Sequence, residues 1–164
     1  PAGDTNSLKS ITVYENKRDS GWYHSGWSGG KMKDFSGKGP DGSNCIGVTG
    51  KPGQGGVTFR TKRDGTDHAT PDSAQGKWHL QFVMNSSMNM KIKLLTIEKG
   101  VGSKEIYLSK YKAGDAVNGW QKYSIPLKDS APKAQRFSGI AIRVPKGLSE
   151  PIMIDNMTLE LLPN

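Results

Sequence analysis

Aromatic side chains cluster near the start of the chain, and they are the residues best suited to bind a ligand by stacking. Trp22, Tyr23, His24 and Trp27 lie within six positions, in a segment otherwise made of glycine and serine. Such small neighbours leave large rings exposed, and each ring offers a wide apolar surface with few rotamers to freeze. The C–H face of a sugar ring can stack on that surface. We therefore expect a binding loop in which Trp22, Tyr23 and Trp27 contact a ligand; the alternative is that Trp22 anchors the loop on the core.

Several later segments alternate apolar and polar residues with period two, for example 56–61, 78–83, 91–97 and 138–144. This period is typical of strands with one buried face and one polar face. The predicted core consists of Val57, Phe59, Trp78, Leu80, Phe82, Ile92, Leu94, Ile140, Ile142 and Ile154. The opposite faces carry Thr58, Arg60, His79, Gln81, Lys91, Lys93 and Arg143. If these strands are neighbours, their polar side chains form one surface. We expect Arg60, His79, Gln81 and Arg143 to bind hydroxyl-rich ligands there; a merely solvated face is the alternative.

The whole pattern favours an all-β fold. Eight to ten short strands are separated by turns rich in glycine and proline, and no window carries a helical stripe with caps. Such a series predicts a β-sandwich or jelly roll of two antiparallel sheets. We expect one domain over residues 9–164, with residues 1–8 as the remnant of a linker. No apolar run approaches the roughly 20 residues that cross a membrane, so no membrane partner is expected.

The net charge is +8, from 23 lysines and arginines against 15 acids. No run of five like charges occurs, which favours solvated faces over a nucleic-acid partner and predicts binding that depends weakly on salt. The alternative is that Arg60, Lys91, Lys93 and Arg143 grip a uronate. The single cysteine, Cys45, excludes an internal disulfide and is expected to be a buried thiol.

Catalytic signatures are missing from the sequence. It contains no His-Glu-x-x-His stretch, nucleophile elbow or phosphate loop, and its three histidines lack metal spacing. We therefore expect no enzyme activity. Two alternatives stay open. One is a small jelly-roll polysaccharide lyase with His79, Arg60, Arg143 and Tyr123 as its set; the other is a cell-surface adhesion domain.

Four segments in order carry a resemblance: Ile11–Asn16 with Ser20–Trp22, Gly119–Asp129, Phe137–Ile142 and Ile152–Leu159. Together they span nearly the whole chain, and their order resembles the galactose-binding-like jelly rolls that serve as carbohydrate-binding modules beside glycanases. The resemblance implies a secreted, monomeric, non-catalytic module that binds a polysaccharide and is attached to a glycoside hydrolase.

The resemblance also implies one structural calcium ion, held near the start of the first strand and the end of the last. Glu15 and Asp155 stand at the matching positions. Calcium prefers carboxylate and carbonyl oxygens, and the two acids can meet if the first and last strands are neighbours. The alternative is that Asp155 begins a turn. Among the other aromatic residues, Trp78 and Trp120 are expected to pack inside, and Tyr111 to line a binding site in a loop.

Overall fold

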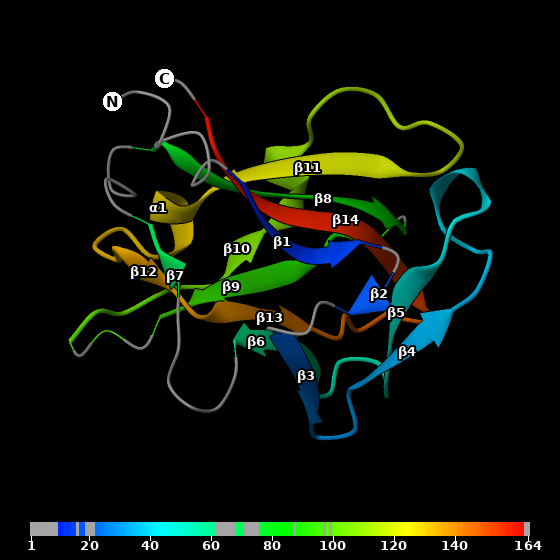
Figure 1. Cartoon of the computed structure of the whole chain (residues 1–164). Helices are drawn as coiled ribbons and strands as arrows, with labels where there is room; N and C mark the ends of the chain where they lie inside the picture. Colours follow the sequence, from blue (N-terminus) through cyan, green and yellow to red (C-terminus); the bar gives the residue numbers. More distant parts are fainter. Residues whose placement is uncertain are drawn as a thin grey trace.

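Period-two alternation gives each sheet one apolar face, and the two apolar faces pack against each other in the computed structural model (Figure 1). The structure describes residues 10–15, 17–18, 22–61, 68–70, 76–86, 88–96, 98 and 100–162. Every pairing between its named strands is antiparallel. The predicted β-sandwich of two antiparallel sheets is therefore confirmed. The expected linker remnant, residues 1–8, lies outside the described residues.

The first sheet has seven strands, with β14 (Ile152–Leu161) at its centre. β8 pairs with β14 along most of its length, and β11 continues the sheet beyond β8. On the other side, β14 pairs with β5 near its start and with β1 near its end, so the first and last strands are neighbours as expected. The remaining strands of this sheet have the bounds β1 Ser10–Glu15, β2 Lys17–Arg18, β4 Lys31–Phe35, β5 Cys45–Thr49, β8 Trp78–Asn85 and β11 Gln121–Pro126.

The second sheet has five strands in the order β10–β9–β13–β6–β3. Their bounds are β3 Trp22–Trp27, β6 Gly56–Thr61, β9 Lys91–Leu95, β10 Ile106–Tyr107 and β13 Gly139–Arg143. A two-stranded ribbon joins β7 (His68–Ala69) to β12 (Arg136–Phe137). In the part of the chain that the structure describes, helical structure is confined to single turns: η2 Pro40–Gly42, η4 Leu108–Tyr111 and α1 Leu127–Ser130. No helix in the described ranges is long and apolar enough to cross a membrane.

The core lies between the two sheets, and all ten residues predicted for it are buried. Trp78 is the largest of them at 2% exposed, and Trp120 is also buried, as expected. Cys45 is a free, buried thiol, which confirms its prediction. Burial and, after it, the nearby Asp155 carboxylate raise the pKa of this thiol, so it stays protonated and unreactive at neutral pH.

One local prediction is wrong. Residues 22–27 do not form a loop but β3, an edge strand that pairs with β6 over six residues. The small residues Ser25 and Gly26 suggested a loop, because glycine is weak in strands. Tertiary pairing overrides that preference here: a Cβ on Gly26 would collide with the carbonyl of Gly30, so the backbone folds back more closely than any side chain allows.

Candidate binding face

Trp27 lies at the edge of the five-stranded sheet, on its outward face. Its partner across the strand pair is Gly56, and the indole is 36% exposed. A Cβ on Gly56 would collide with the ring carbons Cη2 and Cζ2 of Trp27. The six-membered part of the indole therefore covers Gly56. Because glycine occupies this position, the ring lies against the sheet and keeps an open surface.

A row of outward-facing residues continues from Trp27 across the whole sheet. Gly56 pairs with Arg143 on β13, the register of β13 on β9 brings Arg143 beside Lys91, and Lys91 pairs with Tyr107 on β10. Tyr107 is 45% exposed, so the row has an open aromatic ring at each end. Four spacings of about 4.8 Å separate the two outer strands, or about 19 Å in total.

The middle of the row is charged and held in place. Arg143 donates from Nε to Glu105 Oε2 at 2.9 Å and from Nη2 to Glu105 Oε1 at 3.0 Å. This hydrogen bonding lowers the pKa of Glu105 and raises that of Arg143. The ammonium of Lys91 lies 5.1 Å from the centre of the Tyr107 ring, a cation–π distance. The pair and the ring contact fix groups that would otherwise sample many rotamers.

The next rows of the same face are polar. Ser25 and Thr58 form a hydroxyl pair at 2.9 Å between β3 and β6. Thr58 pairs with Ala141, and Ala141 with Lys93, so this row joins small hydroxyl groups to a cation. Arg60 is exposed and pairs with Tyr23 by backbone register. The side chains of Trp22 and Tyr23 lie outside the described residues, so their predicted ligand contacts stay predictions.

His79 and Gln81 do not belong to this face, so their predicted grouping with Arg60 and Arg143 is wrong. Both lie on β8 of the other sheet, and both are tied to Ser124 on β11. Gln81 Nε2 donates to Ser124 Oγ at 3.1 Å, and Ser124 Oγ lies 3.3 Å from His79 Nδ1. The strands β6 and β8 alternate in the same way, but alternation does not reveal which sheet a strand joins.

The residues named for a lyase are also separated. Tyr123 is buried and stacks on Phe82 at 5.4 Å between ring centres, on the inner side of the seven-stranded sheet. Burial raises its pKa. His79 lies on the outer side of that sheet, and Arg143 on the outer side of the other one. These side chains form no common site, so the structure does not assemble that catalytic set.

Tyr107 is the functional candidate that sequence reasoning missed. Ile106, its neighbour, is half-buried and packs on the core, whereas Tyr107 faces outward. The apolar–polar alternation of residues 105–108 already indicates that Tyr107 faces outward. A hollow of about 340 Å³ adjoins Tyr107 and continues the face past the end of β13; it is lined by Gly53, Asn89, Lys91, Tyr107, Arg143, Val144, Pro145 and Lys146.

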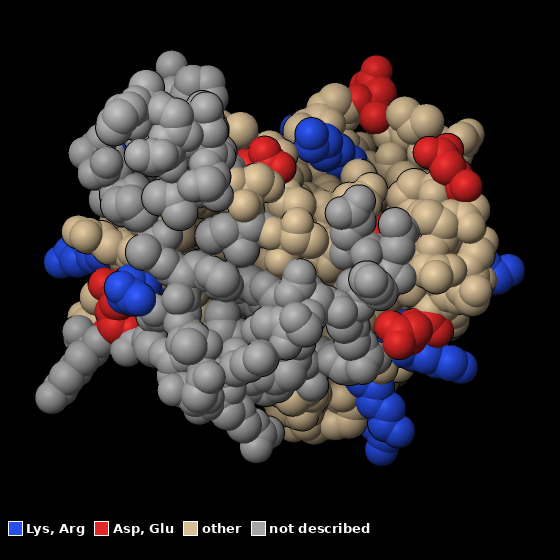
Figure 2. Space-filling model, viewed as in Figure 1, with Lys and Arg blue, Asp and Glu red and all other residues tan. Residues whose placement is uncertain are grey.

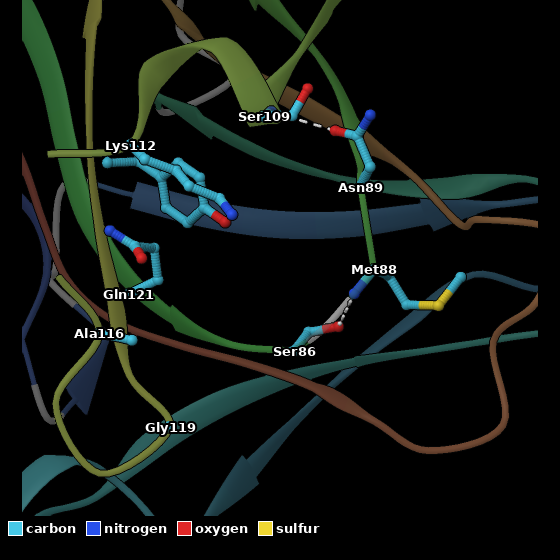
Figure 3. A pocket seen from close by; sticks show the side chains of 9 residues that line it. Ser86, Met88, Asn89, Ser109, Lys112, Ala116, Gly119 and Gln121 are labelled. Atoms are coloured by element: carbon cyan, nitrogen blue, oxygen red, sulfur yellow. Dashed lines mark hydrogen bonds between the residues drawn. The ribbon is translucent and has the colours of Figure 1, made fainter.

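A smaller pocket of about 200 Å³ lies at the loop end beside β11 (Figure 3). Asn89 lines both this pocket and the larger hollow. In the pocket, Asn89 Oδ1 accepts from the amide of Ser109 at 3.0 Å, and Ser86 Oγ accepts from the amide of Met88 at 3.1 Å. These contacts order the polar rim of the pocket. Tyr111, expected in a loop site, instead borders a neighbouring hollow.

Tyr111 is engaged within the protein. Its hydroxyl donates to Asp129 Oδ2 at 2.9 Å. Burial, together with this hydrogen bond and the Asp129 charge, raises the pKa of Tyr111 to about 12. The hydroxyl therefore stays protonated at physiological pH and fastens η4 to α1.

The calcium prediction rests on Asp155, which is 1% exposed. Its Oδ1 accepts from the amide of Asn156 at 2.8 Å, and its Oδ2 from Ser43 Oγ at 3.3 Å. The described residues contain no cluster of three acidic, histidine or cysteine side chains. The side chain of Glu15 lies outside the described residues, so calcium stays a prediction.

Comparison with known proteins locates the fold. The sequence matches no protein-family model and no curated protein. Its structure is similar to the family 30 carbohydrate-binding module of a cellulosomal cellulase from Clostridium thermocellum, with a TM-score of 0.62, 13% identity, and coverage of 96% of this chain and 100% of that one. It is also similar to a family 29 module from Piromyces equi, with a TM-score of 0.59, 15% identity and coverage of 93% and 89%.

A third similar structure is a longer chain: the CBM22-1–GH10 modules of xylanase 10B from Clostridium thermocellum, complexed with xylohexaose. The TM-score is 0.51 at 15% identity, and the match covers 93% of this chain and 28% of that one. At such identities the likeness defines the fold. The chain therefore has the β-sandwich fold of carbohydrate-binding modules.

Proposed function

We propose that this protein binds a polysaccharide, without cleaving it, on the outward face of the five-stranded sheet. The row from Trp27 to Tyr107 carries the proposal, because it places two exposed rings at the ends of a line of fixed hydrogen-bonding groups. Rings supply stacking surface for pyranose C–H faces, and guanidinium and ammonium groups donate to hydroxyl or acidic oxygens. The fold, shared with family 29 and family 30 modules, supports this use.

The biological setting is part of the same proposal. The protein acts outside the cell, as a monomer that targets a covalently attached glycan-degrading enzyme to its substrate. The support is that the same fold occurs in one chain with a GH10 module in a xylanase. Affinity of each single module is modest, because binding orders an exposed glycan and sheds its water.

Native affinity gels containing one polysaccharide each test the proposal. We expect at least one β-glucan, xylan, mannan or uronate polymer to retard the protein, and Trp27→Ala to abolish that retardation. Val117→Ala is the matched control, because Val117 is also an exposed apolar residue, 67% exposed, but lies in the loop before β11. This control should migrate like the wild type.

The same mixtures are assayed for released reducing ends and for unsaturated products that absorb in the ultraviolet. Retention with no product supports a binding module. Retention accompanied by product formation would contradict the non-catalytic part of the proposal, and no retention by any polymer would contradict the binding part.

A further inference from the structure

We propose that the ligand of this face is an anionic polysaccharide, one whose sugars carry carboxylate or sulfate groups. This inference rests on the proposed function and names the ligand class for the same site. The sequence favoured weak salt dependence because its charges are dispersed along the chain. Folding gathers a group of them, and that placement changes the expectation.

The outward positions of the five-stranded sheet carry four cations and, among the described residues, no acid. The cations come from three adjacent strands: Arg60 on β6, Lys91 and Lys93 on β9, and Arg143 on β13. Glu105, a carboxylate beside this face, precedes β10 and is already bound to Arg143. Arg143, Lys91 and Lys93 all lie close enough to lower the pKa of Glu105. Three cations therefore surround one carboxylate, and this cluster keeps a net positive charge.

Arg143 still has donors to offer. Its bonds to Glu105 use the N–H of Nε and one N–H of Nη2, which leaves the second N–H of Nη2 and both N–H groups of Nη1. A guanidinium fixed on one side by a carboxylate is preorganised for a second oxyanion on the other side. Trp27 and Arg143 lie two strands apart in the same row, and the ring of Trp27 covers Gly56, the residue between them. A sugar ring stacked on Trp27 can place an acidic substituent at Nη1.

The positive face is not a simple result of the total charge. Among the described residues on the face seen in Figure 2, lysine, arginine and acidic side chains are intermingled around the rim. The outward side of the seven-stranded sheet likewise mixes His79 and Gln81 with Glu160, which accepts a hydrogen bond from Thr158 at 3.1 Å. Among the described residues, the outward positions of the five-stranded sheet differ from these surfaces because they carry cations without acids.

The free-energy cost of removing water from these cations favours an anionic glycan over a neutral one. A neutral glycan lying across the row would remove water from Lys91 and Lys93 and return only neutral hydroxyl acceptors. A carboxylate or sulfate compensates the desolvated charge, and such charge-assisted hydrogen bonds are about twice as strong as neutral ones. The fold, which is similar to that of a family 30 carbohydrate-binding module, favours an acidic glycan over a nucleic acid.

Paired polymers that share a backbone and differ in charge test the inference. The pairs are polygalacturonate and its methyl ester, carboxymethylcellulose and hydroxyethylcellulose, and dextran sulfate and dextran. The first two pairs probe carboxylate and the third probes sulfate. We expect at least one charged polymer to bind about tenfold or more tightly than its neutral partner. Its affinity should fall about tenfold between about 0.05 M and 0.5 M sodium chloride, because exposed charges are screened over that range.

Two variants locate the effect. Lys93→Gln keeps the Arg143–Glu105 pair intact, and Lys91→Gln removes the ammonium over Tyr107; each should weaken binding of the charged polymer about three- to tenfold and flatten its salt dependence. Lys122→Gln is the control with equal charge change, because Lys122 is exposed on the outward side of β11 in the other sheet. It should bind like the wild type.

Each result supports or overturns the inference. Equal binding of a charged polymer and its neutral partner would overturn it and leave the proposed function standing. The same affinity loss in Lys122→Gln as in Lys93→Gln would also overturn it, since the attraction would then come from net charge. Tighter binding of a single-stranded oligonucleotide than of every glycan would point to a nucleic-acid ligand instead. Failure of every polymer, charged or neutral, would overturn the proposed function as well.

Discussion

The outward faces of the two sheets are built from the same period-two strands but have different surfaces. On the seven-stranded sheet, His79, Gln81 and Ser124 bond to one another, so their polar groups are largely satisfied within the protein. On the five-stranded sheet, Trp27 and Tyr107 keep exposed rings, and Arg143 keeps donors beyond its ion pair. A polar face that is satisfied internally is suited to solvent. A face with open rings and remaining donors is suited to a ligand.

Two tryptophans, one inside and one on the binding face, give the largest expected effect. Trp78→Ala removes a fully packed ring from the core and should lower the free energy of unfolding by about 3–5 kcal/mol. Trp27→Ala removes an exposed ring and should leave the melting temperature close to that of the wild type. Thermal melting of both variants checks this. Early melting of Trp27→Ala would mean that Trp27 is structural and that the binding face needs reassignment.

The affinity change on the two faces is the second comparison. Trp27→Ala should weaken binding of the retained polysaccharide by about 2 kcal/mol, the scale of an anchor residue, or roughly thirtyfold. His79→Ala should leave affinity unchanged, because His79 lies on the other sheet and bonds to Gly76 and Ser124. Isothermal titration calorimetry measures both values. A large loss in His79→Ala with a normal Trp27→Ala would transfer the site to the seven-stranded sheet.

Calcium gives a smaller effect, and it concerns the seven-stranded sheet alone. If an ion at Glu15 and Asp155 joins β1 to β14, a chelator should lower the melting temperature by a few degrees; about 1 kcal/mol corresponds to about 2–4 °C in a chain of this size. Ligand affinity should then change little, because the binding face is on the other sheet. An unchanged melting point together with no metal by elemental analysis would exclude this ion.

The smallest expected effect is on the free energy of unfolding, and it comes from the Arg143–Glu105 ion pair in the binding face. The pKa of Glu105 is lowered in the folded protein, chiefly by its hydrogen bond with Arg143. A lowered folded-state pKa gives stability that is present above the ordinary value of 4.5 and is lost as the pH falls through the folded value. Urea midpoints of the wild type and Glu105→Gln should therefore differ slightly at pH 6 to 7 and converge in acid. A difference that grows as the pH falls would contradict this assignment.

Sequence patterns predicted the fold and the interior because both depend on alternation within single segments. All ten predicted core residues are buried, and the strands near 56–61, 121–125 and 152–161 lie where expected. The binding face depends on pairing between distant segments, and local alternation carries no such information. Alternation alone therefore groups His79 and Gln81 with Arg60, and it gives no sign that residues 22–27 pair with β6.

Tyr107 and Gly56 are two residues of the binding face that the sequence alone does not identify. Tyr107 alternates outward beside Ile106, so its exposure was present in the sequence, but its place in one row with Trp27 requires the register of four strand pairs. Gly56 has no side chain to suggest a role. Only the structure reveals that the missing side chain of Gly56 leaves room for the Trp27 ring to lie against the sheet with one surface exposed.

Amide chemical shifts during titration with the retained polysaccharide test the central claim most directly, because they compare both faces in one experiment. We expect the largest changes at the Trp27 indole N–H and at the amides of β3, β6, β13 and β9, with little change on β8 and β11. Chemical-shift changes concentrated around His79, Gln81 and Ser124, with no change on β3, β6, β13 and β9, would contradict this binding face.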